Sequence, residues 1–290
     1  MITGASSGFG QLTSLTLARK GFQVFATMRA VKGRNAAAAQ KFEDLAKRES
    51  LGLHVLELDV TDEASVESAV GIALAQCGRI DVLVNNAGYG IMDLSETVTL
   101  AQAQRQLDVN FFGVARMNRA VLPAMKRQGS GLLLHVSSGG GRLAIPGMGV
   151  YCASKFAMEA LAETYRYELA AMGIDSVIIE PGAYATPIAD KLERGEDPAR
   201  KSGYGAMAQV PENVLKLIRN SRGNPQEIAD KILEIIRTPA GQRRLRYRVG
   251  PGGPGVERIN ALTDEIQVEL LKAFGVTELA KFKGARESAK

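Results

Sequence analysis

Hydrophobic and polar positions divide the chain into short apolar runs and longer segments with helical spacing. The apolar runs, rich in β-branched and aliphatic residues, predict strands at Gln23–Thr27, Leu53–Leu58, Asp81–Asn85, Leu132–Ser137, Ile174–Glu180 and Leu245–Val249. The segments with helical spacing predict helices near residues 8–19, 36–48, 62–76, 99–127, 151–172 and 225–237. Strands and helices that alternate in this way form βαβ units, and strands this uniformly apolar are covered on both faces. The pattern therefore predicts one α/β domain over residues 1–290, with a doubly wound, mostly parallel sheet and helices on both faces.

Two segments depart from this alternation. Residues 186–224 are charged, with scattered glycine and proline. A long irregular insertion in a compact domain is often a lid or substrate loop, so we expect a lid here, with a plain surface excursion as the alternative. Residues 255–290 show helical apolar spacing followed by a basic end, which predicts a C-terminal helical tail that frays at its end.

Composition narrows the class of protein. The 290 residues are 46% hydrophobic, enough for a substantial core, but contain no run of 18 apolar residues and no charged-then-apolar leader. We therefore expect neither a membrane span nor a signal peptide. Two cysteines fit a reducing compartment, and two histidines without close cysteine spacing argue against a protein-held metal. The composition predicts a cytoplasmic protein that needs no metal.

The net charge is mildly positive and does not require a nucleic-acid partner. A net charge of +5 suits a polyanionic small molecule as readily as a nucleic acid. In the basic stretch GQRRLRYRVG at residues 241–250, Arg244, Arg246 and Arg248 alternate with apolar residues. This alternation predicts a half-buried edge strand whose charged face points outward and discourages edge pairing. We therefore expect no nucleic-acid partner.

The chain opens MITGASSGFG, in which Gly4, Gly8 and Gly10 form the pattern G-x-x-x-G-x-G. Glycines allow a sharp turn and the close approach of a pyrophosphate, and the following helix offers free N–H groups to phosphates. Alone this pattern is weak, because an ordinary glycine turn has the same residues. Only residues 1–3 precede the turn, which is short for a strand. We therefore expect that the natural protein begins upstream, or that this version is marginally stable.

Three further stretches support a working glycine turn. NNAG at 85–88 and HVSS at 135–138 end two predicted strands, and YCASK at 151–155 opens a helix with Tyr151 and Lys155 on one face. Ligands of an open α/β sheet bind outside the carboxyl ends of its strands. These stretches therefore converge on the crevice where the glycine turn would hold a dinucleotide.

Together with Asn110, Ser138 and PG at 181–182, the motifs TGASSGFG, NNAG and YCASK resemble the short-chain dehydrogenase/reductase family. The resemblance covers residues 1 to about 186 and includes the spacing of 13 positions from Ser138 to Tyr151. The stretch VYCASKFAMEAL is similar to the branch that contains 17β-hydroxysteroid and retinol dehydrogenases. The resemblance implies a Rossmann-type NAD(P)-binding domain that transfers a hydride between a nicotinamide and a carbonyl or secondary alcohol.

The family's catalytic residues map onto Asn110, Ser138, Tyr151 and Lys155. Tyr151 is the expected general acid/base, and a nearby Lys155 ammonium favours the phenolate and lowers its pKa from about 10. By resemblance, Lys155 also bonds the nicotinamide ribose, Ser138 holds the substrate oxygen and Asn110 anchors a water. Ser137 is the alternative to Ser138, and a structural role in its helix is the alternative for Asn110.

Some cofactor contacts are expected from the motifs themselves and others by resemblance. The full set is Gly4, Ser6, Ser7, Gly8, Phe9, Gly10, Arg29, Asp59, Val60, Asn86, Ala87, Gly88, Tyr151, Lys155, Pro181, Gly182 and Thr186. A strand-end cap is the alternative role for Asp59, and a plain turn is the alternative for 86–88.

The type of nicotinamide follows from the end of the strand predicted at 23–27. That region reads VFATMRAVKGR and lacks the carboxylate that accepts hydrogen bonds from the ribose of NAD. An arginine grips a 2′-phosphate with its planar fork, whereas a carboxylate repels it. Arg29 therefore favours NADP(H), with Lys32 or Arg34 as substitutes for Arg29 and NAD(H) as the alternative cofactor.

The leading expectation is an NADP(H)-dependent carbonyl reductase or alcohol dehydrogenase. An epimerase or dehydratase shares the Tyr/Lys pair but more often carries G-x-x-G-x-x-G, and a redox-sensing protein that binds dinucleotide without turnover is the alternative from another class. Four residues suggest an apolar cavity for a steroid, retinoid or lipid-like ketone, although core packing explains them nearly as well: Met92, Ala144, Ile145 and Met148.

We also expect a homodimer or homotetramer. Relatives commonly pair through the helices predicted near 99–127 and 151–172. The latter helix carries apolar residues over more than one face: Phe156, Met158, Leu161, Ala162, Tyr165 and Leu169. Since one face must cover the sheet, the surplus apolar surface indicates a second copy of the chain.

Overall fold

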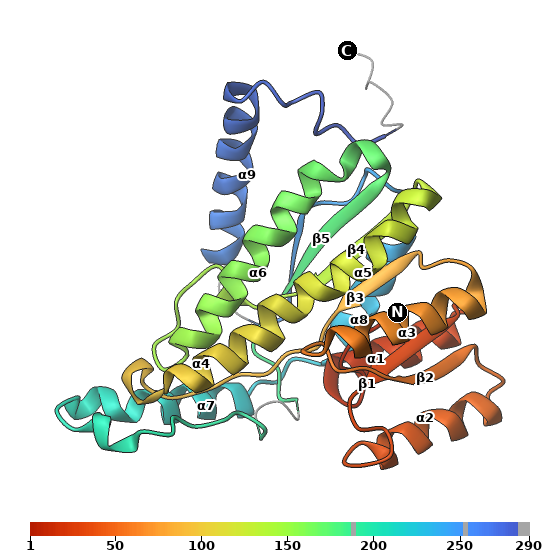
Figure 1. Cartoon of the computed structure of the whole chain (residues 1–290). Helices are drawn as coiled ribbons and strands as arrows, with labels where there is room; N and C mark the ends of the chain where they lie inside the picture. The colour runs from red at the N-terminus through yellow and green to blue at the C-terminus, as the bar shows by residue number, and fades with distance from the viewer. Residues whose placement is uncertain (187–189, 252–254, 284–290) are drawn as a thin grey trace.

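A parallel sheet forms the centre of the computed structural model, which describes residues 1–186, 190–251 and 255–283 (Figure 1). Its strands are β1 (Val24–Met28), β2 (Leu53–Glu57), β3 (Val82–Asn85), β4 (Gly131–Val136), β5 (Ile174–Pro181) and β6 (Arg246–Val249). β1 pairs with β2, while β3, β4, β5 and β6 pair in that order, always in parallel. Each strand overlaps one of the predicted apolar runs, so the doubly wound α/β prediction is confirmed.

Ile2 joins the two parts of the sheet. It bridges Ala26 of β1 on one side and Val84 of β3 on the other, both in parallel. The ammonium of Met1 donates to the carbonyl of Val82 at 2.9 Å. The three residues before the glycine turn therefore lie at the middle of the sheet and are buried there.

Helices cover both faces of the sheet (Figure 1). One layer consists of α1 (Gly8–Arg19), α2 (Ala36–Arg48) and α8 (Gln226–Arg237), which bury Leu17, Phe42 and Ile232 in one core. The opposite layer consists of α3 (Glu63–Cys77), α5 (Gly113–Gln128) and α6 (Gly149–Glu168), which contribute Val66, Met117 and Tyr165 to a second core. The periodic apolar faces of these helices and the doubly covered strands account for the two cores.

The long helix predicted near 99–127 is divided in the structure. α4 (Leu100–Leu107) continues into a π-helical turn, Asp108–Phe112, before α5 begins. This turn carries Asn110, whose side chain is buried. π-helical turns occur mostly as single bulges within α-helices and frequently at functional sites. The apolar spacing did not reveal the turn, because a single inserted residue barely changes the helical pattern.

Residues 190–224 are more regular than the irregular lid that we expected. They contain α7 (Val210–Arg219), which buries Leu215 against Met92 and Met148. Residues 187–189 of the predicted lid lie outside the described residues. Because α7 has one apolar face, it packs as a helix beside the end of the sheet rather than as a loop.

The basic strand β6 departs from its predicted orientation. Arg246 is buried rather than outward-facing, and its guanidinium pairs with Glu159 at 3.2 Å and with Glu163 at 2.6 Å. The alternation correctly predicted a strand. Its buried arginine is compensated by carboxylates from α6, and sequence spacing alone cannot show such partners.

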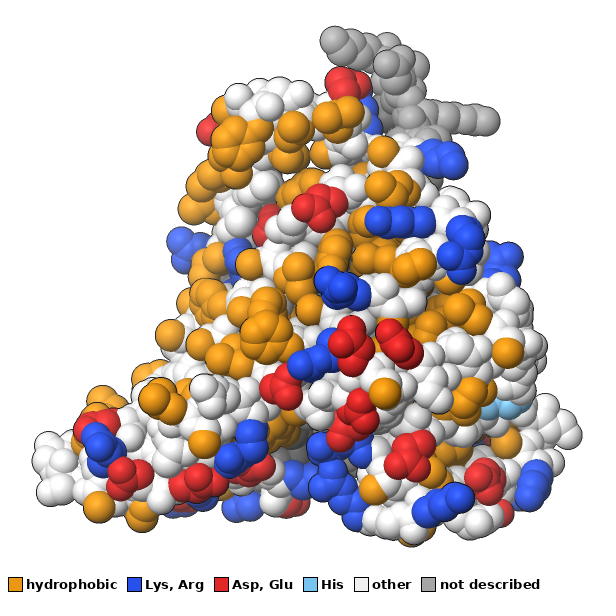
Figure 2. Space-filling view, viewed as in Figure 1, with side chains coloured by type: hydrophobic (Ala, Val, Ile, Leu, Met, Phe, Trp, Pro, Cys, Tyr) orange, Lys and Arg blue, Asp and Glu red, His pale blue; other side chains and the backbone are white. Residues whose placement is uncertain are grey.

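The last described helix, α9 (Gly255–Ala273), confirms the helical spacing predicted after residue 255. Residues 284–290, where fraying was expected, lie outside the described residues. Hydrophobic side chains gather over α9 at the upper left of Figure 2, where Leu262, Ile266 and Leu270 are exposed. Across the described ranges, no helix has the length and apolar character needed to cross a bilayer.

Candidate active site

The glycine turn is fastened to the end of β3. Asn86 Nδ2 donates to the carbonyls of Thr3 at 2.8 Å and Gly4 at 3.1 Å, while Thr3 Oγ1 accepts from the backbone N–H groups of Asn86 and Ala87. Gly4 has a φ of 66°, and a Cβ placed on it would lie 2.8 Å from the Cα of Ala87. The two motifs 4–10 and 85–88 thus form one interlocked unit in which a side chain larger than glycine does not fit at Gly4 or Gly10.

The N-terminus of α1 fits a phosphate group. Ser7 occupies its N-cap position without a capping hydrogen bond from its side chain. At Gly8, with a φ of 57°, a Cβ would meet no atom within 4 Å, which leaves open space above the helix end. Free N–H groups and the positive end of the helix dipole favour anions at such a place. Sequence reasoning missed Lys191, whose Nζ donates to Ser7 Oγ at 3.2 Å.

The other end of the cofactor crevice lies after β1 and β2. Arg29 Nη1 lies 3.6 Å from Asp59 Oδ2, and both side chains are partly exposed. Thr61 donates to Asp59 Oδ1 from its backbone N–H at 3.0 Å and from its hydroxyl at 2.8 Å. Burial opposes ionisation of Asp59, but the Thr61 bonds and the charge of Arg29 together hold its pKa below the usual value. Val60, the next residue, is buried. Asp59 therefore does cap its own turn, the alternative role we had considered.

α6 places Tyr151 and Lys155 at the end of β4. Lys155 is 6% exposed, its Nζ donates to the carbonyl of Val136 at 2.8 Å, and the same atom lies 6.0 Å from the centre of the Tyr151 ring. A Cβ on Gly88 would come within 3.2 Å of Asn110 Oδ1 and 3.7 Å of Lys155 Nζ. These predicted site residues are therefore neighbours in space.

Asn110 uses its side chain to fix the loop after β3. Its Oδ1 accepts from the N–H of Tyr89 at 3.1 Å, and its Nδ2 donates to the Tyr89 carbonyl at 2.9 Å and to Ser154 Oγ at 3.0 Å. These bonds tie the π-helical turn both to the NNAG loop and to α6. This role differs from the one within its own helix that we considered as the alternative for Asn110, because its partners lie in the loop and in α6.

The two adjacent serines after β4 face different partners. Ser137 is buried and donates to Glu159 Oε1 at 2.5 Å. Ser138 Oγ accepts from the N–H of Gly140 at 3.1 Å and interacts with the hydroxyl of Tyr151. Successive residues of an extended chain point to opposite sides, so only one of the two serines faces Tyr151, and that one is Ser138.

The electrostatics at Tyr151 differ from our expectation. Burial raises the pKa of Tyr151 to about 12, and hydrogen bonding to Ser138 offsets only part of this rise. Burial also lowers the pKa of Lys155 to about 8, against the opposing charge of Glu159. The pKa of Tyr151 is therefore higher than we predicted, because desolvation dominates and the amine of Lys155 is directed at the Val136 carbonyl.

A cavity of about 950 Å³ opens beside Tyr151 and Ser138. Predicted cofactor residues Phe9, Pro181, Gly182 and Thr186 line one part of it. The other part is lined by apolar side chains from distant segments: Leu143, Ile145, Met148, Leu192, Val214, Leu217, Ile218 and Val256. This is the large apolar pocket with a few convergent polar groups that ligand sites usually show.

The apolar residues predicted for the cavity are only partly correct. Ile145 and Met148 line it, whereas Ala144 is not among the lining residues and Met92 packs in the adjacent core. Sequence reasoning missed the α7 contribution of Val214, Leu217 and Ile218. Their i, i+3, i+4 spacing is a helical signal that could have identified this face.

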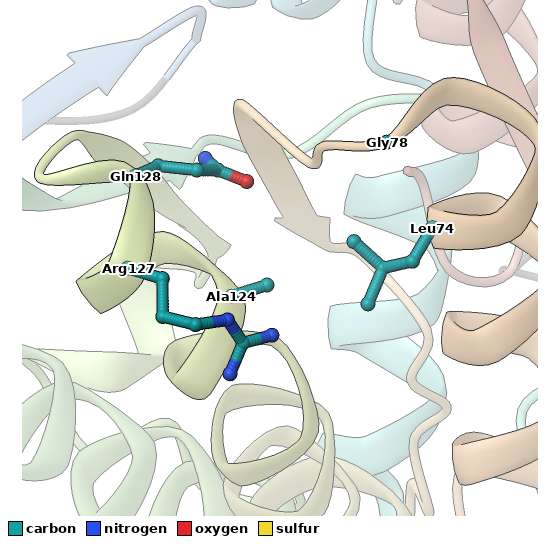
Figure 3. Close-up of a pocket in the computed structure, with 5 residues that line it drawn as sticks. All are labelled: Leu74, Gly78, Ala124, Arg127 and Gln128. Atoms are coloured by element: carbon teal, nitrogen blue, oxygen red, sulfur yellow. The ribbon is translucent and has the colours of Figure 1, made fainter.

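A smaller cavity of about 240 Å³ lies far from this chemistry, between the ends of α3 and α5 (Figure 3). Leu74 and Arg127 extend toward each other across it. Gln128, at its edge, bonds both the N–H and the carbonyl of Ile80. The polar side chain of Gln128 is thus already bonded to the backbone of Ile80.

Among the described residues, no group of His, Cys, Asp and Glu is suited to hold a metal ion.

Comparison with known proteins places these features in a family. The family model described as short chain dehydrogenase matches residues 1–197. The human 17-beta-hydroxysteroid dehydrogenase type 1 is 37% identical, with 85% of this chain and 76% of that protein covered. The 3-ketodihydrosphingosine reductase of Bacteroides thetaiotaomicron is 34% identical, with 87% of each covered.

Solved structures are similar over nearly the whole chain. A short-chain dehydrogenase from Streptomyces avermitilis has a TM-score of 0.73 at 31% identity and covers 97% of this chain and 98% of its own. The Thermococcus sibiricus alcohol dehydrogenase complexed with 5-hydroxy-NADP has a TM-score of 0.67 at 26% identity, with 87% and 97% covered. The Brucella melitensis 3-ketoacyl-(acyl-carrier-protein) reductase complexed with NADH has a TM-score of 0.69 at 27% identity, with 86% and 94% covered. Similar folds thus bind either nicotinamide.

Proposed function

The chain belongs to the short-chain dehydrogenase family, and from this premise we propose that it is an NADP(H)-dependent reductase of bulky apolar ketones with Tyr151 as general acid. Oxidoreductases of this family act on alcohols and ketones with a nicotinamide cofactor. The observation that carries the finer proposal is the placement of Tyr151 and Ser138 on the wall of a large cavity whose other walls are mostly apolar.

The cofactor fits the interlocked glycine turn. The N–H groups at the start of α1, with Ser6, Ser7 and Lys191 beside them, would hold the pyrophosphate, and Pro181, Gly182 and Thr186 would border the nicotinamide. When bound, the cofactor would supply the hydride. Asp59 and Val60 would flank the adenine, while Arg29, which lies 3.6 Å from Asp59, would grip a 2′-phosphate.

The protein's own groups handle the proton. With its pKa raised to about 12, Tyr151 is protonated at neutral pH and can donate to the oxygen of a ketone in the cavity. Ser138, the neighbouring neutral donor, orients that oxygen. Lys155 places positive charge beside the phenol, which stabilises the phenolate left after proton transfer. Asn110 keeps the loop and helix around Lys155 in place.

The substrate is expected to be bulky and apolar. The cavity walls from 143–148 and from α7 are hydrophobic, and Leu217 is both part of the wall and 73% exposed. A large apolar ketone would cover such surface and gain roughly 25 cal/mol per Å² buried. The relatives named for a steroid and for a long-chain sphingoid base are consistent with this class. Residues 190–224 act as the lid of this cavity.

A test separates this proposal from a dinucleotide sensor. Purified protein is titrated with NADPH and with NADH, and consumption of each reduced cofactor is then followed with ketones graded from small and polar to bulky and apolar. We expect tighter NADPH binding and a kcat/KM that rises with apolar bulk. NADPH binding without turnover of any ketone would favour the sensor, and equal use of small polar ketones would contradict the substrate class.

The active form is proposed to be a homodimer through α4, α5 and α6. Leu100 of α4, Phe112 of the π-helical turn before α5 and Phe156 of α6 are 82%, 50% and 42% exposed. Large apolar side chains exposed together on adjacent helices are typical of a self-complementary interface. Sedimentation at micromolar concentration tests it, and a stable monomer would contradict the proposal.

A further inference from the structure

A third polar residue continues the line of Tyr151 and Lys155 along α6. Glu159 follows Lys155 by one helical turn, so the three side chains lie on the same face of the helix. Glu159 is 1% exposed. A carboxylate so completely buried requires partners, and the partners it has are connected to the catalytic residues.

The carboxylate of Glu159 holds the beginning of the loop that carries Ser138. Its Oε1 accepts from Ser137 Oγ at 2.5 Å, and a Cβ on Gly141 would lie 2.3 Å from the same oxygen. The backbone of the turn at 139–141 therefore lies directly against Glu159. Its other oxygen, Oε2, accepts from Arg246 Nε at 3.2 Å.

Charged groups from several elements surround Glu159, and they are not evenly distributed. On the side of the sheet and the C-terminal helix it faces Glu163 of α6, Glu180 of β5, Arg246 of β6, Arg142 of the loop and, across Arg246, Asp264 of α9. On the side of Lys155 the other titratable neighbours are Tyr151 and His135, both of which burial keeps uncharged at neutral pH. Among the described residues, Glu159 is thus the ionisable carboxylate that acts on the Lys155 ammonium.

We propose that Glu159 is a positioning residue for catalysis, which fixes Ser138 through its bond to Ser137 and keeps Lys155 charged through its own negative charge. This inference rests on the proposed reductase function. Burial lowers the pKa of Lys155 to about 8, and the charge of Glu159 opposes this shift and so favours the ammonium. Burial raises the pKa of Glu159 itself, while the bonds from Ser137 and Arg246 and the charge of Arg142 favour its carboxylate form.

The test replaces the charge without changing the shape. In Glu159→Gln we expect the alkaline limb of the kcat profile, assigned to deprotonation of Lys155, to move to lower pH by roughly one unit, the usual scale for loss of a nearby opposite charge. The matched control is Glu163→Gln, one turn further along α6 and bonded to the same Arg246 at 2.6 Å. It should leave the limb in place. An unmoved limb in Glu159→Gln, or an equal shift in both variants, would overturn the charge role.

Ser137→Ala tests the second role separately. It removes the bond to Glu159 but keeps the carboxylate, so we expect kcat to fall roughly tenfold, about the value of one hydrogen bond to a charged group, with a smaller movement of the alkaline limb than in Glu159→Gln. Unchanged kcat in Ser137→Ala would overturn the positioning of Ser138. A limb that moves as far as in Glu159→Gln would contradict the separation of the two roles.

A readout independent of turnover keeps this inference apart from the proposed function. The titration of the Lys155 Cε signal by NMR, assigned with Lys155→Arg, reports the same pKa in a protein that reduces no ketone. If Glu159→Gln does not fold, Glu159→Met, a neutral side chain of similar size, takes its place, and Arg246 keeps Glu163 and Glu180 as partners. A Lys155 signal that titrates as in the unmodified protein would overturn the proposal, whatever the enzyme assay shows.

Discussion

The two sides of the crevice are built in different ways. On the cofactor side, the glycine turn is held by backbone groups and by Asn86, with atoms so close that a Cβ on Gly10 would lie 2.4 Å from Asn86 Nδ2. On the substrate side, the cavity is enclosed by side chains from 143–148, α7 and α9. Backbone packing tolerates no added atom, whereas an apolar wall accepts many side chains of similar size. Short sequence motifs therefore identify the cofactor side, whereas no such motif identifies the substrate side.

The two sides also differ in how far their charged groups are exposed to water. On the cofactor side the charged pair Arg29 and Asp59 is half exposed, so water screens it. Behind the catalytic side, Lys155 and Glu159 are buried, and desolvation lowers the pKa of the lysine and raises that of the glutamate. Water therefore weakens the charges on the first side, whereas burial shifts the pKa values of charged groups on the second.

The sharpest test on the catalytic side is Tyr151→Phe. The ring keeps its packing, but the proton donor is lost, so we expect kcat to fall at least roughly a hundredfold. NADPH affinity, measured by fluorescence titration, should change little, since the glycine turn is untouched. An active Tyr151→Phe enzyme would refute the proposed mechanism.

On the cofactor side, a single added methyl group should destabilise the glycine turn. In Gly4→Ala, the new Cβ meets the backbone of Ala87 at 2.8 Å with φ at 66°, so we expect a loss of about 2 kcal/mol in stability together with weaker NADPH binding. Gly8→Ala is the matched control, because its φ of 57° is similar but its Cβ meets nothing within 4 Å. Thermal unfolding should show a smaller loss there, about 1 kcal/mol. Equal losses would mean that backbone strain, not packing against Ala87, sets the cost.

Arg29→Asp should move cofactor choice without touching catalysis. Reversing this charge repels a 2′-phosphate, so we expect the ratio of kcat/KM for NADPH over NADH to fall roughly tenfold, about the value of one charge-assisted hydrogen bond. Arg34→Asp, which changes an exposed residue in the same loop, is the control. A preference that moves only in Arg34→Asp would transfer the 2′-phosphate contact to that residue.

The smallest effect concerns the centre of the sheet. Burial lowers the pKa of the Met1 ammonium to about 5 from 8.0. The unfolded chain then binds the extra proton between these values, so the stability of the fold rises as pH increases from about 5 to 8. Extending the chain before Met1 by about four β-branched residues replaces the ammonium with an amide that still donates to Val82.

We expect this extension to stabilise the protein by roughly 1 kcal/mol at neutral pH and to flatten the pH dependence, as measured by thermal unfolding from pH 5 to 8. A glycine–serine extension of equal length is the control, since it removes the ammonium without adding strand propensity. Catalysis should be unchanged in all three proteins. If neither extension raises Tm, the short strand is adequate as it is.

Sequence alone determined the elements and the cofactor side. The alternation of strands and helices, the glycine spacing at 4–10, and the stretches NNAG and YCASK each describe local geometry, which repeats wherever the same residues occur in the same order. Even the choice of Ser138 over Ser137 followed from spacing, and in the structure Ser138 is the serine that interacts with Tyr151.

Only the tertiary structure decided which residues from distant segments contact one another. It turned Arg246 inward onto Glu159, raised rather than lowered the pKa of Tyr151, and brought α7 to the cavity wall. Desolvation and pairing depend on which atoms surround a group in three dimensions, and those atoms come from residues that can be a hundred positions away along the chain. A pattern of hydrophobic and polar positions specifies which face of an element is buried, but not which charged residue of another element contacts that face.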